Sequence, residues 1–427
     1  MYLKENIIME KFKSVIKKLG KLFAENQIMQ IGAVLALSLI IIVGIILLVS
    51  CSENSSKEDK ETTWNEEQSS TTKEVKETTD GLTSAEVDTT TETTQPETTV
   101  PETTVPETTI PQTTPQPEET TTRANNSSSN NSGIKKLHVS GIHLVDDAGN
   151  VVVLNGVSTH GIAWFPQYVS KETFATVKDS FGGNVIRIAM YSDPNAGYNQ
   201  SLHAKVEEAV SYATELGMYI IIDWHILSDG NPNTYKNEAI AFFDKMSAKY
   251  KDYNNVLYEI CNEPNGNISW SNDVKPYAID VIKTIRANDP DGVILVGTTT
   301  WSQDVDIAAN DPITGFSNIM YTLHFYAATH KDWNRQKLVD ALNKGLPVFV
   351  SEFSICDASG NGWNDVNSGN TWMALLDQYQ ISFVGWSLSN KAEAASIISS
   401  SCNKISGFSD NELTESGAWL VNQLRRH

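Results

Sequence analysis

Cysteine is scarce in this sequence, with four residues in 427, at positions 51, 261, 356 and 402. Three of them lie beyond position 51, and this odd number excludes complete disulfide pairing within that part of the chain. Cys261 lies inside an apolar run and is expected to be a buried free thiol. A disulfide between Cys356 and Cys402 remains an open alternative, because pairing cannot be deduced from the sequence.

Positive charge is also in short supply. The chain has 32 Lys and Arg against 52 Asp and Glu, a net charge of −20 at pH 7. Residues 133–427 share this acidic excess, whereas nucleic-acid-binding domains concentrate basic side chains on one face. The composition therefore argues against a nucleic-acid partner and suits a neutral substrate or a secreted environment.

Residues 52–132 have too few apolar side chains to form a core. Asp and Glu outnumber Lys and Arg there by 17 to 5, in a background of Thr, Ser, Pro and Gln. The burial that such a composition offers cannot offset the entropy of ordering the chain. The five-residue motif beginning at Pro96 recurs from Pro101 and Pro106. We expect a disordered, extended Thr/Pro/Glu-rich linker.

Charge is absent from residues 28–50, which are almost entirely apolar and follow six lysines. About 20 apolar residues cross a bilayer as one helix, and preceding lysines keep the N-terminus inside. We therefore expect residues 1–51 to be a cytoplasmic basic segment and membrane anchor. The alternative is a lipoprotein signal, because the residues up to Cys51 resemble a lipobox, with a lipid on Cys51. Either alternative places the rest of the chain outside the cell membrane.

Residues 133–427 are long enough to bury a large core. Two alternating stretches within 137–156 flank a turn-rich cluster at 146–150 and predict a β-hairpin. Eight strands are expected at 154–158, 184–190, 219–225, 256–262, 293–299, 319–325, 347–352 and 382–388. Amphipathic helices are expected at 202–216, 238–251, 275–287, 336–343, 372–379 and 416–426. This alternation at a spacing near 30 residues predicts an α/β fold, a (β/α)8 TIM barrel.

The alternative fold, a doubly wound sheet, would need a Gly-rich phosphate turn after the first strand. The sequence there is Asn155-Gly156-Val157-Ser158-Thr159-His160 and contains no such turn. We therefore expect the barrel, preceded by a transmembrane helix and the disordered linker.

Two of the expected strands finish in a glutamate. Glu263 follows an apolar run and stands before Pro264, which ends a regular element, and Glu352 ends the expected seventh strand. A buried charge costs several kcal/mol unless it is compensated, and active sites of these barrels lie at the carboxyl ends of the strands. We interpret Glu263 and Glu352 as a catalytic pair.

The other strand ends carry polar or aromatic residues that a barrel core does not need. They are His160, Arg187 with Tyr191, His225, Asn262, Trp301, His324 with Tyr326, and Trp386. Together with His160-Gly161-Ile162-Ala163-Trp164, Asp223-Trp224-His225, Asn262-Glu263-Pro264 and Trp386 to Glu393, this ordered set resembles the bacterial endo-β-1,4-glucanases (cellulases) of glycoside hydrolase family 5. The resemblance covers residues 134–427.

The resemblance implies hydrolysis with retention, with Glu263 as acid/base and Glu352 as nucleophile, a chemistry that needs two carboxyl groups about 5–5.5 Å apart. Further substrate-binding roles are implied for twelve residues. Asn262 would bind the sugar 2-hydroxyl, and Arg187 and Tyr326 would hold Glu352 ionised. His160, His225 and His324 would line the reacting subsite together with Tyr191 and Trp386. Trp164 and Trp301 would stack on neighbouring sugars, and Lys391 and Glu393 would act further along the glycan.

Several residues keep a structural interpretation. Glu259 is expected to be a structural ion-pair member, and Trp224 is either core or site. Five tryptophans lack a motif and are expected in helix packing or surface stacking: Trp270, Trp333, Trp363, Trp372 and Trp419. The three histidines lack the spacing of an HExxH zinc site, so we expect no metal and no cofactor.

The expected protein is a monomeric cell-surface endoglucanase whose partner is a β-glucan polysaccharide. A β-mannanase, a xyloglucanase and a mixed-linkage β-glucanase are alternatives with the same chemistry. A non-catalytic glycan-binding surface protein is the alternative from another class, but such a protein would be expected to lack one of the two glutamates.

Overall fold

A computed structural model describes residues 133–427 of the chain. The expected anchor over residues 28–50, the lipid-bearing alternative at Cys51 and the linker over 52–132 lie outside the described residues. Within 133–427, every helix is too short or too polar to cross a bilayer.

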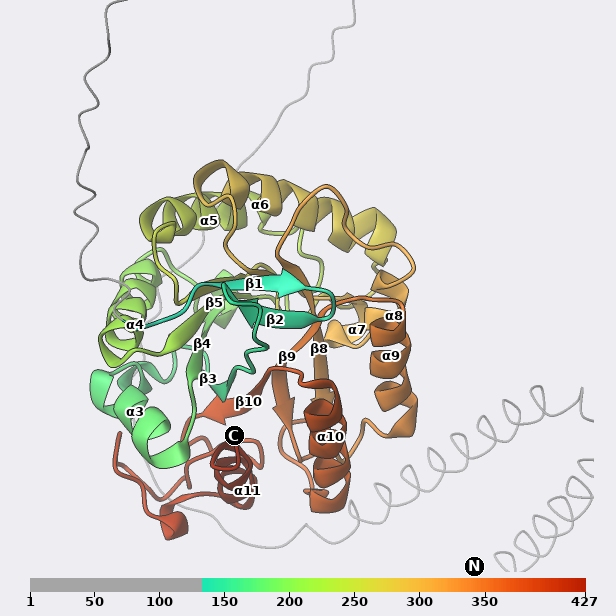
Figure 1. The fold of residues 1–427 in the computed structure, drawn as a ribbon. Coiled ribbons are helices and arrows are strands. Elements are labelled where there is room, and N and C mark those ends of the chain that lie inside the picture. Colours follow the sequence, from blue (N-terminus) through green and yellow to red (C-terminus); the bar gives the residue numbers. More distant parts are fainter. Residues whose placement is uncertain (1–132) are drawn as a thin grey trace, which may run out of the picture. The chain divides into compact units, whose positions relative to one another are not determined.

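Eight parallel strands close into a barrel, which confirms the predicted (β/α)8 fold (Figure 1). The strands are β3 (Asn155–Thr159), β4 (Val185–Tyr191), β5 (Tyr219–His225), β6 (Val256–Glu259), β7 (Ile294–Val296), β8 (Ile319–Tyr326), β9 (Val348–Ser354) and β10 (Phe383–Leu388). Each strand pairs with its neighbours in chain order, and β10 pairs with β3 to close the ring. The apolar runs of the sequence become strands because both of their faces are buried, one in the barrel and one under the helices.

The helices surround the strands. They are α3 (Lys171–Thr176), α4 (Leu202–Leu216), α5 (Lys236–Tyr250), α6 (Lys275–Asn288), α7 (Thr299–Ser302), α8 (Val305–Ala308), α9 (Asp332–Asn343), α10 (Val366–Tyr379) and α11 (Glu415–Leu424). Short 3₁₀ or π turns are η2 (Pro166–Tyr168), η3 (Val177–Phe181), η4 (Pro194–Ala196), η5 (Trp270–Val274) and η6 (Asp410–Glu412). Helix α4 illustrates why these segments are helical. Its buried residues recur at helical spacing, at Val206, Ala209, Val210 and Ala213. Gly217, in the left-handed conformation, ends the helix.

A two-stranded antiparallel sheet precedes the barrel, formed by β1 (Leu137–Ser140) and β2 (His143–Asp146). The turn that joins them is at Gly141 and Ile142, so the predicted position of the hairpin turn at 146–150 was wrong. That cluster does reverse the chain, because the Asp146 side chain accepts backbone hydrogen bonds there, but the segment after it pairs only through a Val145–Val151 bridge.

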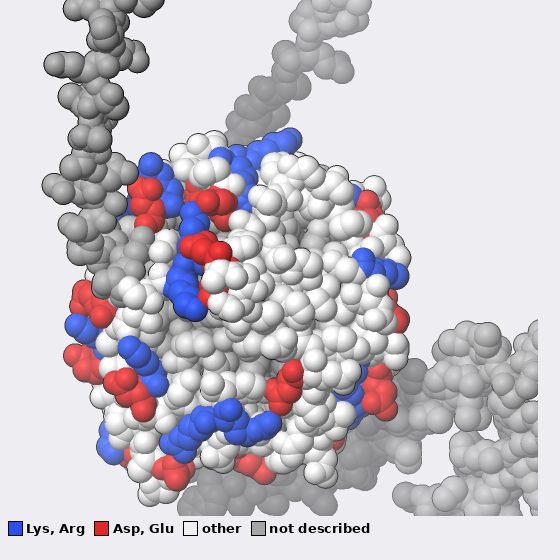
Figure 2. Space-filling model, in the orientation of Figure 1, with Lys and Arg blue, Asp and Glu red and all other residues white. Residues whose placement is uncertain are grey.

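The hairpin covers the amino-terminal end of the barrel. Leu137 and Leu144 pack in one buried cluster with residues that begin the barrel strands, among them Val185, Ile221 and Leu257. Figure 1 shows β1 and β2 lying across the ring of strands at this end. The face seen in Figure 2 carries basic and acidic side chains interspersed, without a field of one sign. The opposite end of the barrel remains open for a site.

Three strands end two or three residues away from the expected position. One of them is β7, which ends at Val296 instead of at residue 299. β6 ends at Glu259, three residues early, so Asn262 and Glu263 lie in the following segment. There the backbone N–H of Asn262 donates a hydrogen bond to the carbonyl of Trp224, which holds the segment against β5. β9 continues to Ser354, so Glu352 lies within the strand and does not end it.

The three cysteines in the described part of the chain are free and buried. Cys261 is the buried thiol that was predicted, and the alternative disulfide between Cys356 and Cys402 does not form.

Candidate active site

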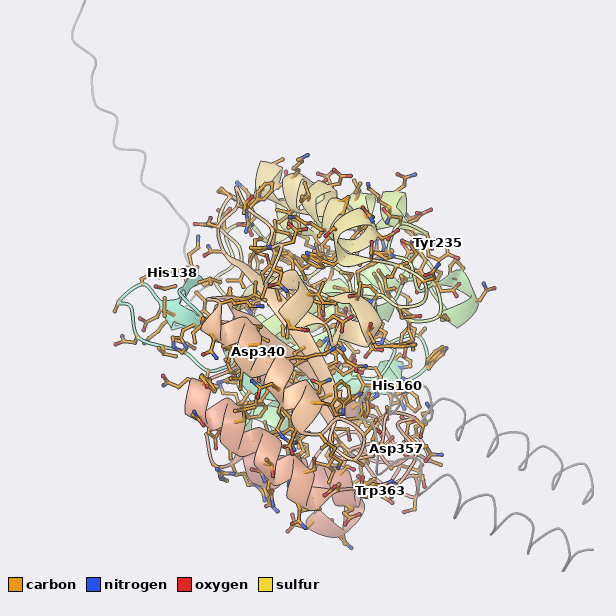
Figure 3. All side chains as sticks on the ribbon, turned by 90° about the vertical axis from the view of Figure 1, so that its right-hand side faces the viewer. His138, His160, Tyr235, Asp340, Asp357 and Trp363 are labelled. Atoms are coloured by element: carbon orange, nitrogen blue, oxygen red, sulfur yellow. The ribbon has the colours of Figure 1, made fainter. Side chains whose placement is uncertain are left out.

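A cleft of about 450 Å³ opens beyond the carboxyl ends of the strands. Figure 3 shows His160, which lines it, on the opposite side of the barrel from His138 of the hairpin. The lining residues are His160, Tyr191, His225, Leu227, Glu263, Trp301, Gln303, His324, Tyr326, His330, Glu352, Ala358, Ser359, Gly360, Trp386, Lys391 and Glu393. Pockets of this size accommodate a few sugar units or a comparably small ligand.

Glu263 and Glu352 face each other in this cleft. Together with a ring nitrogen of His324, one carboxylate oxygen of each lies within 4.8 Å of the others. Both side chains are largely buried, with 8% and 4% exposure. Two acidic groups of the same sign at this distance in a partly dry site do not ionise equally easily.

Glu352 is held by two donors. The Tyr326 hydroxyl donates to its Oε1 at 2.9 Å, and Nη1 of Arg187 donates to its Oε2 at 3.1 Å. Charge-assisted bonds of this kind stabilise the ionised carboxylate and fix its direction. The expectation that Arg187 and Tyr326 contact Glu352 is therefore met by the geometry.

Arg187 lies fully buried below the cleft and organises several groups. It forms a two-pronged ion pair with Glu259 at 2.7 and 3.1 Å, and it lies 3.1 Å from Asp223. Its Nη2 also donates to Asn262 Oδ1 at 2.6 Å. Burial opposes its charge, but the carboxylates of Asp223, Glu259 and Glu352 outweigh burial and raise its pKa. Burial likewise opposes ionisation of Glu259, yet Arg187 lowers the pKa of that carboxyl to about 2. Glu259 is thus the structural ion-pair member that was predicted.

Glu263 lies in surroundings that favour its protonated form. Burial is the main cause, and the neighbouring charge of Glu352 adds to it, so that the pKa of Glu263 rises to about 7. His324 opposes this rise, because its Nδ1 lies 2.9 Å from Glu263 Oε1. The raised pKa of Glu263 is typical of a carboxyl group that acts as a general acid near neutral pH.

His324 carries a positive charge at neutral pH. Burial by itself would lower its pKa, but the nearby carboxyl groups of Glu259 and Glu263 and the charge of Glu352 raise it to about 9. Its Nε2 donates to Ser351 Oγ at 2.9 Å, and Ser351 donates to Glu259 Oε1 at 2.8 Å. A hydrogen-bonded chain thus runs from Glu263 to the Arg187 network.

The other two predicted histidines are neutral. Burial lowers the pKa of His225 to about 3, with the charge of Arg187 acting in the same direction, and burial also lowers the pKa of His160 to about 3. Nδ1 of His225 lies 2.7 Å from Asp223 Oδ2. The backbone amide of Gly161 donates to His160 Nδ1 at 2.7 Å, so the His160 proton is on Nε2, which faces Glu393 Oε1 at 3.8 Å.

Trp386 forms an apolar wall of the cleft. Its ring stacks on His225, with centroids 5.2 Å apart and an angle of 16°, and lies 5.1 Å from His160. Trp164 and Trp301 are about half exposed, at the rim and in the lining respectively. Lys391 pairs with Glu393 at 2.6 Å at the edge of the same cleft.

The group in residues 133–427 with metal-ligand spacing is Glu263, His324 and Glu352. It is not the trio of histidines considered from the sequence. An imidazolium has no free lone pair, so His324 would have to lose its proton before it could bind a cation. The donor set suits proton chemistry between two carboxyl groups better than metal binding.

Of the fourteen predicted site residues, eleven line the cleft. The exceptions are Arg187 and Asn262, which are buried beneath it, and Trp164, which lies beside Tyr191 with ring centroids 4.7 Å apart. Trp224 belongs to the core, where it packs on Phe242.

Six lining residues were not predicted. They are Leu227, Gln303, His330, Ala358, Ser359 and Gly360. Gln303 adjoins the Trp301 motif and was within reach of sequence reasoning. The others lie on loops or at a helix start without a periodic signal, and only the folded chain brings them to the cleft.

Comparison with known proteins gives consistent matches. Residues 145–392 match the family described as Cellulase (glycosyl hydrolase family 5). The chain is 48% identical over 297 residues to Endoglucanase A of Butyrivibrio fibrisolvens, covering 68% of each protein. It is 45% identical to an endoglucanase of Clostridium saccharobutylicum, covering 68% of this chain and 65% of the relative.

Solved structures agree. Cellulase Cel5C_n has a TM-score of 0.65 and 41% identity, over 70% of this chain and 94% of that one. The catalytic domain of Thermobifida fusca endoglucanase Cel5A, in a complex with cellotetraose, has a TM-score of 0.63 and 34% identity, over 68% of this chain and 97% of that one.

Proposed function

The chain belongs to the cellulases of glycosyl hydrolase family 5 and is an endo-β-1,4-glucanase, and from this premise we propose that it cleaves β-1,4-glucan with retention of configuration, on the outer face of a membrane. The observation that carries the retaining mechanism is the close approach of the two glutamates, with one carboxylate oxygen of Glu263 within 4.8 Å of one of Glu352. Inverting enzymes need about 6.5–9.5 Å to admit a water between the two groups.

In the first step, protonated Glu263 donates its proton to the glycosidic oxygen while Glu352 attacks the anomeric carbon. The glycosidic bond breaks, the shortened glucan leaves as an alcohol, and a glycosyl ester forms on Glu352. The raised pKa of Glu263, about 7, supports the first role, and the bonds from Arg187 and Tyr326 to Glu352 support the second.

In the second step the charge on Glu352 has been consumed in the ester. The repulsion that raises the pKa of Glu263 disappears with it, while His324 still favours the ionised form. Glu263 can then take a proton from a water molecule, which attacks the anomeric carbon and releases Glu352 as a carboxylate. The same residue therefore acts first as an acid and then as a base.

Sugar recognition follows from the aromatic and polar lining. Trp386 presents a flat face to the reacting sugar, and the neutral imidazoles of His160 and His225 offer hydrogen bonds at its rim. Asn262 lies at the base of the cleft, with its Oδ1 bound by Arg187 and its Nδ2 donating to the carbonyl of Ile226 at 2.9 Å. We propose that it reaches the 2-hydroxyl through Nδ2 when substrate displaces this local bonding.

The location and state of the whole chain are also proposals. The uncharged stretch over 28–50 and the preceding lysines support a membrane anchor, and the polar composition of 52–132 supports a spacer between the membrane and the barrel. We propose a monomer that acts on glucan outside the cell.

Proton NMR of a β-1,4-glucan oligosaccharide during its first turnovers tests the mechanism. The full chain should release the β-anomer first, and an initial α-anomer would contradict retention. In Glu352→Gln, turnover should fall by about 10⁴-fold or more, because the nucleophile is absent, while oligosaccharide binding persists. Undiminished turnover would exclude Glu352 as nucleophile.

A substrate panel tests the choice of polysaccharide. Carboxymethylcellulose should be hydrolysed fastest, ahead of mannan, xyloglucan and barley β-glucan. Faster hydrolysis of mannan or of barley β-glucan would retain the mechanism and replace the proposed substrate.

A further inference from the structure

The exposed tryptophans of this barrel lie in the segments that follow the carboxyl ends of its strands. Residues 133–427 contain nine tryptophans, and the exposed ones are Trp164, Trp301, Trp333 and Trp363. They follow the carboxyl ends of β3, β7, β8 and β9 respectively. Trp164 and Trp301 belong to the site already described. Trp333 and Trp363 do not line the cleft, yet they are 50% and 61% exposed, which is unusual for the largest apolar side chain.

The two residues are continuous with the cleft. His330 lines the cleft, and its ring lies edge-on to that of Trp333, with centroids 5.6 Å apart. Ser359 and Gly360 also line the cleft, and Trp363 follows three residues later in the same loop. Figure 3 shows Trp363 and Asp357 of this loop on the same side of the barrel as His160.

Both rings are held in place. Nζ of Lys331 lies 5.4 Å from the centroid of the Trp363 ring and donates to Asp365 at 2.5 Å, which ties the start of α9 to the loop of Trp363. Nζ of Lys337 lies 5.6 Å from the Trp333 ring and donates to Asp304 at 2.6 Å. A cation over one face of an indole is attractive, and the half-exposed ring keeps its other face available to a ligand.

We propose that Trp333 and Trp363 form a second glucan-binding surface, outside the cleft, that holds a neighbouring stretch of cellulose against the catalytic domain. The apolar faces of glucose rings can stack on exposed indoles, each of which has a lysine over its ring. The proposed substrate is a polymer of such rings, so we take it as the ligand of this surface. The proposal rests on the glucanase function above and adds a binding site that catalysis of a short substrate does not use.

The test measures binding and catalysis separately, on the full chain purified in detergent. Binding to insoluble cellulose is measured in a Glu352→Gln background, with Trp333→Ala, Trp363→Ala and both together. The association constant should fall about tenfold in the double variant, the loss expected for two stacked rings. With Glu352 intact, kcat/KM for soluble cellotetraose should stay within about twofold of the parent value.

Two further variants control the interpretation. Trp363→Tyr keeps a stacking ring and should restore most of the binding that Trp363→Ala loses. Val151→Ala removes an exposed apolar side chain beside the hairpin, at the other end of the barrel, and should leave binding unchanged.

The proposal is overturned if the double variant binds insoluble cellulose as the parent does. It is also overturned if kcat/KM for cellotetraose falls as far as binding does, since the two rings would then belong to the cleft. If the parent hydrolyses no β-1,4-glucan but binds cellulose through these tryptophans, the proposed function is wrong and the proposal of a glucan-binding surface is retained.

Discussion

At the scale of single residues, the site depends on charges that are buried but compensated. Arg187 has no exposure, and it contacts Glu259, Asp223, Glu352 and Asn262. A guanidinium presents five donors in a fixed plane, so one residue can aim several groups at once. Glu352 and the floor of the cleft are therefore oriented by the same side chain.

Arg187→Lys is expected to destabilise the protein and to reduce activity. A lysine cannot form the two-pronged pair with Glu259 and also reach Glu352, so buried carboxylates lose their compensation. The free energy of unfolding, measured in urea, should fall by about 3–5 kcal/mol. Arg426→Lys, whose side chain is 56% exposed where it pairs with Asp377, is the control and should cost less than about 1 kcal/mol. Equal losses in the two variants would argue against the network.

The alkaline limb of the pH dependence of kcat/KM should follow the loss of the proton from Glu263. Its pKa is raised to about 7, so the protonated acid is present below that value and is lost as pH rises through it. In His324→Gln the opposing cation is gone, so burial and Glu352 should move the alkaline limb upward, by on the order of one pH unit. The maximal rate should fall as well.

His330→Gln is the matched control for this titration. Burial lowers the pKa of His330 to about 4, so its replacement removes a neutral ring from the same cleft and should leave the limb in place. If the alkaline limb of His324→Gln is unchanged or moves to lower pH, the assignment of this limb to Glu263 is contradicted.

At the scale of elements, the segment after β6 fixes the position of Glu263. β6 ends at Glu259. Gly297 after β7 allows the backbone of the following segment to approach closely, since a Cβ there would lie 2.1 Å from the carbonyl oxygen of Cys261. Ser302 then donates to the carbonyl of Asn262. These contacts hold Asn262 and Glu263 at the mouth of the barrel.

The hairpin β1–β2 is expected to contribute stability without contributing to chemistry. Leu144→Ala removes a buried side chain that packs against the amino-terminal end of the barrel and should lower the free energy of unfolding by about 2–5 kcal/mol. Ser140→Ala, at an exposed position of β1, should change it by less than about 0.5 kcal/mol. The kcat of folded Leu144→Ala should equal that of the parent, and a large loss of kcat would mean that the hairpin influences the cleft.

At the scale of the whole molecule, the proposed arrangement is a catalytic barrel tethered to a membrane through a spacer. The two alternatives for membrane attachment differ in whether they need Cys51. A lipoprotein signal needs it as the site of the lipid, and a signal anchor does not. With an anchor over 28–50, Cys51→Ala should remain in the membrane fraction, and the parent should incorporate no fatty-acid label. Labelling of the parent that is lost in Cys51→Ala would replace the anchor by a lipoprotein signal.

Much of this molecule is determined locally along the chain. The eight apolar runs predicted the barrel because parallel strands are buried on both faces. The two glutamates expected at strand ends indicated the site because a buried charge is costly unless it is compensated, although Glu263 lies beyond β6 and Glu352 lies within β9. Boundaries were less predictable: the hairpin turn lies at Gly141 and Ile142, where the sequence has a weaker turn signal than at 146–150.

Only the tertiary structure decided which charged groups lie close enough to influence one another and which residues line the cleft. The pKa of Glu263 depends on Glu352 and His324, which lie 89 and 61 positions away in the sequence, and His330 and Gly360 reach the cleft on loops without periodicity. Desolvation and Coulomb interactions depend on distance in space. The sequence therefore named the two carboxyl groups, and the family resemblance gave them roles, but the burial and the neighbouring charges that raise the pKa of Glu263 exist only in the closed barrel.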